Sequence, residues 1–491
     1  MSLDAIRCSL AWLSFAAAIG CAGGSKSPSF GGGADGDGGP GGAASAATSG
    51  GASGDATHGG APSGTVLPWL RTSGNAFVTD AGVPVRLTGV GLSNQSWGQW
   101  VNGTSEELAA ANRDALVRPT EQYPWVLSDA DFDTLQGLSV RALRYDVNYE
   151  LFSPDNPKQN QNLARLRSHA ERFGRMGAYL IVNLAMPIGL DNQSDSVERA
   201  KPAPDRELSI FENPDYFAAT VKMWKTVART LADLPQVVGY ELINEPRLPA
   251  DADGGLPSYQ AKYQALYEAI REVDAQHTIF VPEYNSREAN PGETYLDAKT
   301  QQPVLDSGQQ GVIWDRHFVP ITGTNIAYVF HLYDPYEYTS AGAASFSKGT
   351  VEGAIDAKVA ERDKFGSAPL IITEYGVNRQ QTADKRREWL SVVHKKLRAE
   401  SISALYFTYK SALDPYVPAS TAFGLFGQFV TRESYVTTTG GRETLKTGVQ
   451  TEAAKNGFDG VFDAYFRGQP ASYLSPLDNA SVVEELSTFW L

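Results

Sequence analysis

The chain has 491 residues, of which 42% are hydrophobic and 11% aromatic, so it can bury a large core. Its formal net charge of −14 disfavours binding to nucleic acid or anionic lipid headgroups and suits a neutral substrate. The only two cysteines, Cys8 and Cys21, lie at the extreme N-terminus, which excludes a disulfide, a cysteine nucleophile and a cysteine zinc site from the rest of the chain. The histidines show no HExxH spacing, and we predict neither a metal nor a cofactor.

Residues 1–21 are typical of a bacterial export signal. An apolar run from Cys8 to Ile19 is long enough for a signal peptide and too short to span a bilayer. The residues from Ala18 to Cys21 are similar to a lipobox, which would make Cys21 the lipidated first residue of the mature protein. The alternative is an ordinary cleaved signal peptide that contains a cysteine. Both interpretations predict a secreted or cell-surface protein, and only the first gives it a membrane anchor.

Residues 22–66 are almost entirely Gly, Ala and Ser. Such a segment cannot bury enough apolar surface to offset the entropy lost on ordering. We therefore predict a disordered linker that carries no chemistry and tethers the globular part to its anchor.

Residues 67–491 are predicted to form one catalytic domain, an α/β fold of the (β/α)₈ TIM-barrel type. Eight short apolar runs are candidate parallel strands: Val85–Val90, Val140–Tyr145, Ala178–Leu184, Val237–Ile243, Thr278–Val281, Tyr328–His331, Leu370–Thr373 and Ala404–Tyr409. Amphipathic stretches between them are candidate helices: Leu163–Phe173, Phe217–Leu234, Tyr259–Val273, Val351–Phe365 and Lys385–Glu400. No Gly-x-Gly-x-x-Gly follows the first strand, which disfavours a nucleotide-binding sheet.

Two glutamates follow predicted strands directly, at the barrel end where active sites lie. Glu245 follows the fourth strand and Glu374 the seventh. Strand alternation puts Glu241 on the same side as Glu245, and we choose Glu245 because it lies at the strand end. Paired carboxylates suit glycosidic bond cleavage, in which one donates a proton and the other attacks the anomeric carbon.

These strand ends resemble glycoside hydrolase family 5, the cellulase and mannanase family of retaining barrel hydrolases. The resemblance extends from about Gly74 to Ser411 and is carried by motifs in the family's order: Leu143-Arg144-Tyr145-Asp146, Asn244-Glu245-Pro246, His331-Leu332-Tyr333 and Thr373-Glu374-Tyr375-Gly376.

The resemblance implies a role for each matched residue. Glu245 would be the acid/base and Glu374 the nucleophile. Arg144 would pair with Glu374 and keep it ionised, and Tyr333 would donate a hydrogen bond to the same carboxylate. Asn244 would bind the sugar 2-hydroxyl. His331 would shape the site beside the acid/base.

Other positions depart from the family's pattern. Gly91 ends the first strand, Ala185 stands where the third strand usually carries a His, and Phe407 replaces the tryptophan that forms the floor of a sugar subsite. Trp97 and Trp100 lie in the loop after the first strand, where they would either stack on sugar rings or pack within the loop.

We therefore expect a monomeric, endo-acting O-glycosyl hydrolase that cleaves a β-linked polysaccharide or oligosaccharide, with β-1,4-glucan or β-mannan favoured. Two alternatives stay open: a non-catalytic, glycan-binding surface lipoprotein and a transglycosylase on the same scaffold. Glu283, just after the fifth strand, is expected to reach the cleft or to be a surface carboxylate.

Overall fold

The computed structural model describes residues 66–92, 127, 129–156, 159–189, 208–246, 255–287, 305–306, 309–310, 314–340, 342–379, 381–413, 423–429 and 476–490. The predicted signal peptide with Cys21, the predicted linker up to residue 65, and the loop tryptophans Trp97 and Trp100 lie outside these residues. Within the described ranges, none of the helices has the length and apolar character needed to cross a bilayer.

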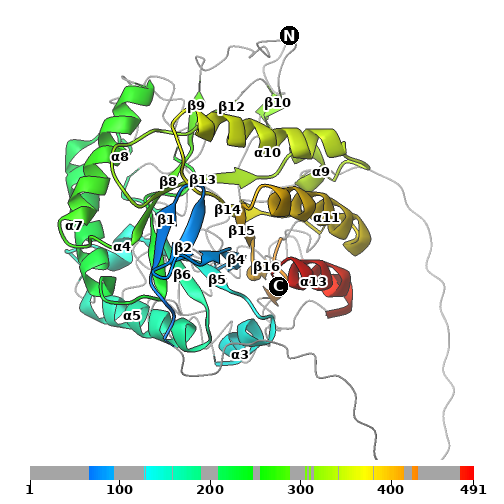
Figure 1. Ribbon diagram of the computed structural model, residues 1–491, viewed down its shortest axis with the longest axis horizontal. Coiled ribbons are helices and arrows are strands. Elements are labelled where there is room, and N and C mark those ends of the chain that lie inside the picture. Colours follow the sequence, from blue (N-terminus) through cyan, green and yellow to red (C-terminus); the bar gives the residue numbers. More distant parts are fainter. Residues whose placement is uncertain are drawn as a thin grey trace, which may run out of the picture.

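Eight parallel strands close into a barrel, which confirms the predicted fold class (Figure 1). Around the barrel they are β4 (Thr88–Gly91), β5 (Ala142–Asn148), β6 (Tyr179–Met186), β7 (Val237–Glu241), β8 (Thr278–Pro282), β13 (Ile326–Leu332), β14 (Leu370–Tyr375) and β15 (Ser403–Tyr406). Hydrogen bonds between β15 and β4 and between β13 and β8 complete the ring.

Helices follow the strands and surround the barrel (Figure 1). They are α3 (Asp129–Gly137), α5 (Gln159–Arg175), α7 (Pro214–Leu231), α8 (Gly255–Arg271), α10 (Lys348–Asp363), α11 (Ala383–Ala399) and α13 (Pro476–Trp490), with the short α4 (Tyr149–Phe152) and α9 (Tyr336–Thr339). Two of the starts have clear local causes. The side chain of Asn213 caps α7, whose first residue is Pro214, and that of Thr382 caps α11.

A small antiparallel sheet closes the N-terminal end of the barrel. It consists of β1 (Leu70–Ser73), β2 (Ala76–Thr79) and β3 (Pro84–Val85). The phenol of Tyr179, the first residue of β6, donates to the carbonyl oxygen of Pro68 at 2.9 Å, and Phe77 packs on Phe280 inside the barrel at 5.8 Å between ring centroids. The candidate functional site lies at the opposite end of the barrel, at the C-terminal ends of the strands.

The barrel interior changes from apolar to polar towards the C-terminal ends of the strands. Buried apolar side chains from the barrel strands form one cluster with Leu70 and Phe77 of the small sheet. Farther along, Asp146, Asn183 and Glu241 are neighbours in register on β5, β6 and β7. All three are buried. Polar groups inside a barrel need partners, so this row marks the level at which the site begins.

The first predicted strand, Val85–Val90, is divided between two sheets. Val85 belongs to β3 and the barrel strand β4 begins only at Thr88. The sequence from Val85 to Val90 is one apolar run, and its pattern alone does not reveal that the chain leaves the small sheet after β3 and enters the barrel at β4. Gly89 fits this position because a β-carbon there would lie 1.9 Å from the carbonyl oxygen of Ala142.

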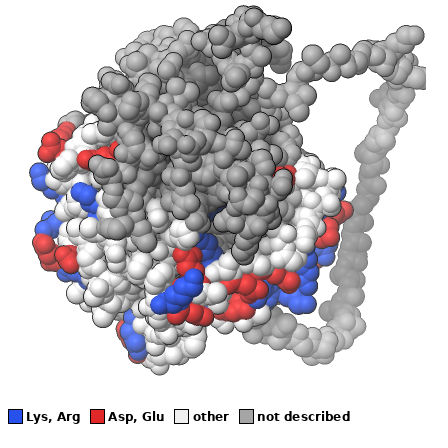
Figure 2. Space-filling model, turned by 90° about the horizontal axis from the view of Figure 1, so that it is seen from above, with Lys and Arg blue, Asp and Glu red and all other residues white. Residues whose placement is uncertain are grey.

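Three further strand pairs lie outside the barrel and were not predicted. They are β9 (Tyr284–Arg287) with β12 (Trp314–His317), β10 (Leu305–Asp306) with β11 (Gln309–Gln310), and β16 (Lys410–Leu413) with β17 (Phe426–Phe429). On the face of the molecule in Figure 2, the described basic and acidic side chains are mixed rather than gathered into a patch of one sign.

Candidate active site

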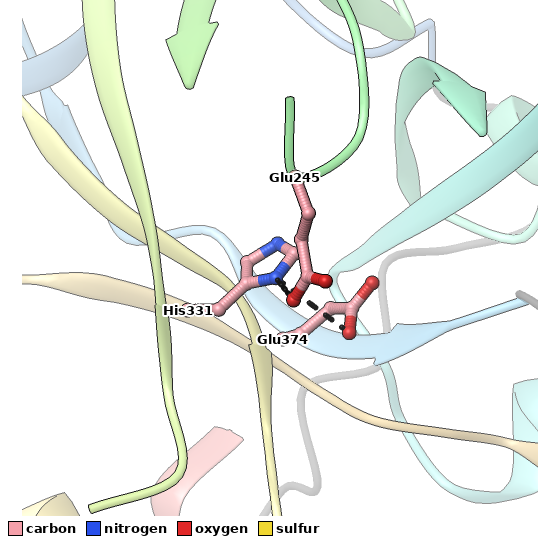
Figure 3. A group of neighbouring side chains, drawn as sticks. All are labelled: Glu245, His331 and Glu374. Carbon is pink, nitrogen blue, oxygen red and sulfur yellow. Dashed lines mark hydrogen bonds and ion pairs between the residues drawn. The ribbon is translucent and has the colours of Figure 1, made fainter. Parts of the chain in front are cut away.

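The two predicted glutamates lie close together at the C-terminal end of the barrel. Glu245 follows β7 and Glu374 lies near the end of β14, and their carboxylates point towards one another with the ring of His331 beside both (Figure 3). One oxygen of each carboxylate and one ring nitrogen of His331 all lie within 4.8 Å of one another.

Arg144, from β5, holds the base of the site together. Its Nε and Nη2 donate to the two carboxylate oxygens of Glu241 at 2.8 and 2.7 Å, and its Nη1 donates to Oε1 of Glu374 at 2.6 Å. Nη2 also donates to Oδ1 of Asn244 at 2.7 Å. Burial alone would lower the pKa of Arg144, but Glu241, Asp146 and Glu374 raise it well above its usual value, so the guanidinium remains a fixed cation.

An irregularity in β14 lets two consecutive residues face the site. Along β13 the register passes from Phe330 opposite Ile372 to His331 opposite Glu374, so Thr373 is an extra residue in β14. Alternation would send Thr373 and Glu374 to opposite faces of the sheet. With the bulge, Glu374 reaches Arg144 while Thr373 reaches Glu241 and His331. Bulges re-aim side chains in this way next to functional sites.

Glu245 lies beyond the last hydrogen-bonded residue of β7. Its φ is +38°, a left-handed conformation that residues other than glycine rarely adopt. Regular strand alternation therefore does not extend to Glu245, but the carboxylates of Glu241 and Glu245 both belong to the inward-facing network of the site. Glu241 points to Arg144 below the site, whereas the carboxylate of Glu245 is at its centre (Figure 3).

His331 connects Glu245 to the buried polar groups beneath it. Nδ1 lies 2.7 Å from Oε1 of Glu245, and Nε2 lies 3.1 Å from the hydroxyl of Thr373. Thr373 donates its only hydroxyl proton to Glu241, at 3.3 Å, so Nε2 must donate to Thr373. Burial lowers the pKa of His331, but the charges of Glu374 and Glu245 outweigh it and the net shift is upward. Nε2 therefore carries a proton, and the upward shift favours a second proton on Nδ1, the nitrogen that faces Glu245.

Tyr333 and Asn244 complete the surroundings of the two carboxylates. The phenol of Tyr333 donates to Oε2 of Glu374 at 3.0 Å, and burial together with the charge of Glu374 raises the pKa of this phenol well above its usual value. The side-chain oxygen of Asn244 is occupied by Arg144, which leaves its amide hydrogens as the groups that can bind an incoming acceptor.

Phe407 lies beside this site in an aromatic cluster. Its ring contacts those of Tyr333 and Phe423 at 6.3 and 5.7 Å between centroids, both edge to face. Phe407 is 7% exposed, so most of its surface is already covered within the protein. The cluster packs against the tyrosine that binds Glu374, and thus supports its position.

The three residues of Figure 3 form the one group that could chelate a metal ion among the residues described here. Their donor atoms already have partners: Glu374 accepts from Arg144 and Tyr333, and Nδ1 of His331 faces Glu245. The same atoms are therefore accounted for by a hydrogen-bonded carboxylate pair.

The sequence missed three residues of this site: Glu241, Thr373 and Asp146. Asp146 accepts a hydrogen bond from Nδ2 of Asn183 at 2.7 Å, and burial raises its pKa to about 6. Strand alternation was an available signal for Glu241 and Asp146, whereas Thr373 turns inward only because of the bulge in β14. Glu283 is not the surface carboxylate of one prediction: it is buried, pairs with Lys358 at 2.6 Å and accepts from the backbone N–H of His331 at 3.4 Å.

Known proteins resemble this chain over its barrel. The model of the cellulase family, glycosyl hydrolase family 5, matches residues 78–412, more than half of the 491-residue chain. A β-xylosidase of Phanerodontia chrysosporium is 24% identical over 44% of this chain and 46% of its own length. An endoglucanase B of Neocallimastix patriciarum is 24% identical over 57% and 53%. An endoglycoceramidase of Hydra vulgaris is 41% identical over 12% and 13%. The chain thus spans about half, or less, of the length of these curated relatives.

Proposed function

The chain belongs to the cellulase family, glycosyl hydrolase family 5, and from this membership we propose that it hydrolyses a β-linked glycan by double displacement, with retention of anomeric configuration. The observation that carries the proposal is the pair of carboxylates within 4.8 Å of each other, oxygen to oxygen. Retaining glycosidases hold their two carboxyl groups about 5–5.5 Å apart, whereas inverting enzymes need a wider gap for a water molecule.

In the first step Glu374 attacks the anomeric carbon while Glu245 gives a proton to the departing glycosidic oxygen. Arg144 and Tyr333 each hold one oxygen of Glu374, which supports an ionised and oriented nucleophile. The amide hydrogens of Asn244 are placed to bind a hydroxyl next to the reacting carbon, as the resemblance implies.

In the second step Glu245, now a carboxylate, takes a proton from a water molecule that attacks the glycosyl ester on Glu374. Nδ1 of His331 is 2.7 Å from Glu245, and a proton on this nitrogen stabilises that carboxylate while the covalent intermediate exists. When the ester is hydrolysed, the proton from water restores the acid. A sugar hydroxyl in place of water would make the same site a transglycosylase.

For the substrate we propose a β-1,4-glucan or a β-mannan, cleaved at internal bonds of the polysaccharide. The family and the endoglucanase relative support this choice. A second candidate is the β-glucosidic bond of a glycolipid, because the relative with 41% identity is an endoglycoceramidase. Release of oligosaccharide from glycosphingolipid in detergent micelles, compared with release from soluble glucan and mannan, separates these substrates.

The decisive test is Glu374→Ala, assayed on aryl β-glycosides with anomer-resolved NMR detection. We expect kcat to fall by roughly 10⁴-fold or more, as for other hydrolases that lose their nucleophile. Azide should restore turnover and give a glycosyl azide of inverted configuration. The control is Glu352→Ala on α10, a glutamate paired with Lys348 at the surface. Unchanged hydrolysis by Glu374→Ala would disprove the assignment, and an inverted product from the wild type would disprove retention.

We further propose that the enzyme acts outside the cytoplasm as a monomer, anchored by a lipid at Cys21 through the Gly-rich linker. The lipobox-like residues from Ala18 to Cys21 support this proposal. Fractionation of cells expressing wild type and Cys21→Ser tests it. The wild type should be found with membranes and the variant in the soluble fraction, and equal distributions would contradict an anchor.

A further inference from the structure

Three polar side chains on β5 and β6 lie beside the catalytic centre without a part in the two-step reaction. Asp146 and Asn148 are on β5, and Asn183 is on β6. Arg144, Asp146 and Asn148 alternate along β5 and therefore face the same side. Asp146 and Asn183 are neighbours in register. The three side chains thus belong to one wall of the barrel mouth.

Asn183 has a buried oxygen with nothing to accept. Its Nδ2 donates to Oδ1 of Asp146 at 2.7 Å. This bond fixes the orientation of the amide, because a carboxylate only accepts hydrogen bonds and the N–H end of the amide is the end that can donate. Its Oδ1 then points elsewhere, is buried and has no hydrogen-bond partner among the residues that the structure describes. The residue itself is 0% exposed. A buried acceptor without a donor is unfavourable unless something supplies one.

Asn148 has a second buried acceptor of the same kind. It occupies the N-cap position of α4, where asparagine usually accepts from the first backbone N–H groups, yet its side chain makes no such bond. Its Oδ1 is also buried and finds no hydrogen-bond partner in the described part of the chain, and the residue is 8% exposed. The side chain of Asn148 therefore does not cap α4, the local role that its position offers.

These groups lie next to the nucleophile. Oδ1 of Asp146 is 3.7 Å from Nη1 of Arg144, and the same Nη1 is 2.6 Å from Glu374. Two residues beyond Asn183 on β6 comes Ala185, a residue with a small side chain, which is the extra residue of a bulge between the pairs Val147–Leu184 and Asn148–Met186. A group that reaches this wall belongs to the molecule whose reacting carbon is at Glu374.

We propose that Asp146, Asn148 and Asn183 form a subsite that binds two hydroxyl groups of the sugar that is transferred to Glu374. The inference rests on the proposed function and adds which part of the substrate the site recognises, namely hydroxyl groups of the transferred sugar. The two asparagine oxygens need donors, and a hydroxyl supplies one while its own oxygen can accept in turn. Asp146 holds the amide of Asn183 in the orientation that receives the hydroxyl. The ligand class is a pyranose with free hydroxyls away from its reducing end.

The test combines substrate and protein changes. The substrates are the 4-nitrophenyl β-glycoside that the wild type hydrolyses fastest and its 3-deoxy, 4-deoxy and 6-deoxy forms. We expect removal of each bound hydroxyl to lower the wild-type kcat/KM about tenfold, the effect of one hydrogen bond to a neutral partner. In Asn148→Ala the penalty for one hydroxyl should disappear while the penalties for the others remain. Asn183→Ala should do the same for the second hydroxyl.

Stability separates this subsite from a structural role. Oδ1 of Asn148 has no partner to lose, so Asn148→Ala should unfold at the same temperature as the wild type or slightly above it. The matched control is Asn162→Ala on α5, because the buried Asn162 donates to the carbonyl oxygen of Leu151 at 2.8 Å. This control should lose stability and keep the wild-type pattern across the deoxy substrates.

A wild-type pattern in both Asn148→Ala and Asn183→Ala would overturn the inference and leave these oxygens to bound water. If the wild type hydrolyses none of the glycosides, the proposed function fails instead. The subsite is then judged by calorimetric titration of wild type and Asn148→Ala with the same glycosides. Equal affinity of the two proteins for every glycoside would overturn it.

Discussion

On each face of β14, a buried histidine from a neighbouring element bonds to a residue of the strand and also to a glutamate. On the inner face, His331 lies beside Glu245 and Thr373. On the outer face, Tyr375 bonds through its hydroxyl to Nε2 of His394 at 3.0 Å, and Nδ1 of His394 bonds to Glu485 of α13 at 2.8 Å.

The pKa values of the two rings move in opposite directions. Burial lowers the pKa of His394 to about 4 despite the bond to Glu485, and Arg398 and Arg86 lower it further. The pKa of His331 rises because Glu374 and Glu245 outweigh burial. A histidine–glutamate contact therefore does not define a reactive site. The number and sign of the surrounding charges do, and the inner face gathers carboxylates while the outer face seals a helix onto the barrel.

The largest expected difference between the faces is in catalysis. Glu245→Gln should lower kcat about 10²–10⁴-fold on a substrate with a poor leaving group, because the proton donor is lost. Glu485→Gln on the outer face should leave kcat unchanged. Steady-state kinetics on both variants measure this. Equal losses would show that the outer pair is coupled to the chemistry, and the distinction between the faces would fail.

Next in size is the effect of removing a charge beneath the inner face. Glu241→Gln leaves the buried guanidinium of Arg144 without the carboxylate that accepts two of its hydrogen bonds, which should destabilise the fold by about 3–5 kcal/mol. Urea unfolding measures the loss. The control is Asp233→Asn, which weakens the exposed pair with Arg167 and should cost at most about 1 kcal/mol. Similar losses of unfolding free energy in the two variants would contradict the view that buried ion pairs stabilise the inner face.

The pH dependence of stability should be a mirror image for the two histidines. The folded pKa of His394 is below its ordinary value, so its contribution is complete above pH 6.5 and is lost as pH falls towards 4, by roughly 3 kcal/mol. The folded pKa of His331 is raised, so its contribution is complete at low pH and is lost as pH rises through the folded value. Urea unfolding of wild type, His394→Gln and His331→Gln across this range gives both curves as differences. Differences that change with pH in the same direction for both variants would contradict opposite pKa shifts.

The smallest expected effects come from removing one hydroxyl on each face. Tyr375→Phe should cost about 1 kcal/mol, the value of one hydrogen bond, and Thr373→Val about 2 kcal/mol, because the hydroxyl of Thr373 bonds to both Glu241 and His331. Only Thr373→Val should also move the alkaline limb of the kcat/KM profile to lower pH, since His331 loses the acceptor of its Nε2 proton. A shift of that limb in Tyr375→Phe would place the outer histidine in the reaction.

Much of the fold and of the candidate site follows from local patterns. Apolar runs of strand length alternate with amphipathic segments, and each barrel strand lies at its predicted position to within a few residues. Glu245, Glu374, His331 and Arg144 follow from the strand ends and from the family resemblance, and the structure brings them together. Their catalytic roles stay with the proposal.

Other features depend on partners far away in the chain. Glu241 has the parity and composition of a site carboxylate, and only its bonds to Arg144, 97 residues away, place it beneath the site. The bulge that turns both Thr373 and Glu374 inward exists as a register shift against β13, and nothing in the residues of β14 themselves records it.

The sequence by itself therefore determined the alternation of strands and helices, the barrel and the two glutamates at its strand ends, because hydrophobic periodicity and short motifs are local. The tertiary structure alone decided which buried carboxylates pair with Arg144, in which direction the pKa of each of the two histidines shifts, and which asparagine oxygens lack a donor among the described residues. Those properties arise from register and from electrostatic fields between strands, and both come into being only when the barrel closes.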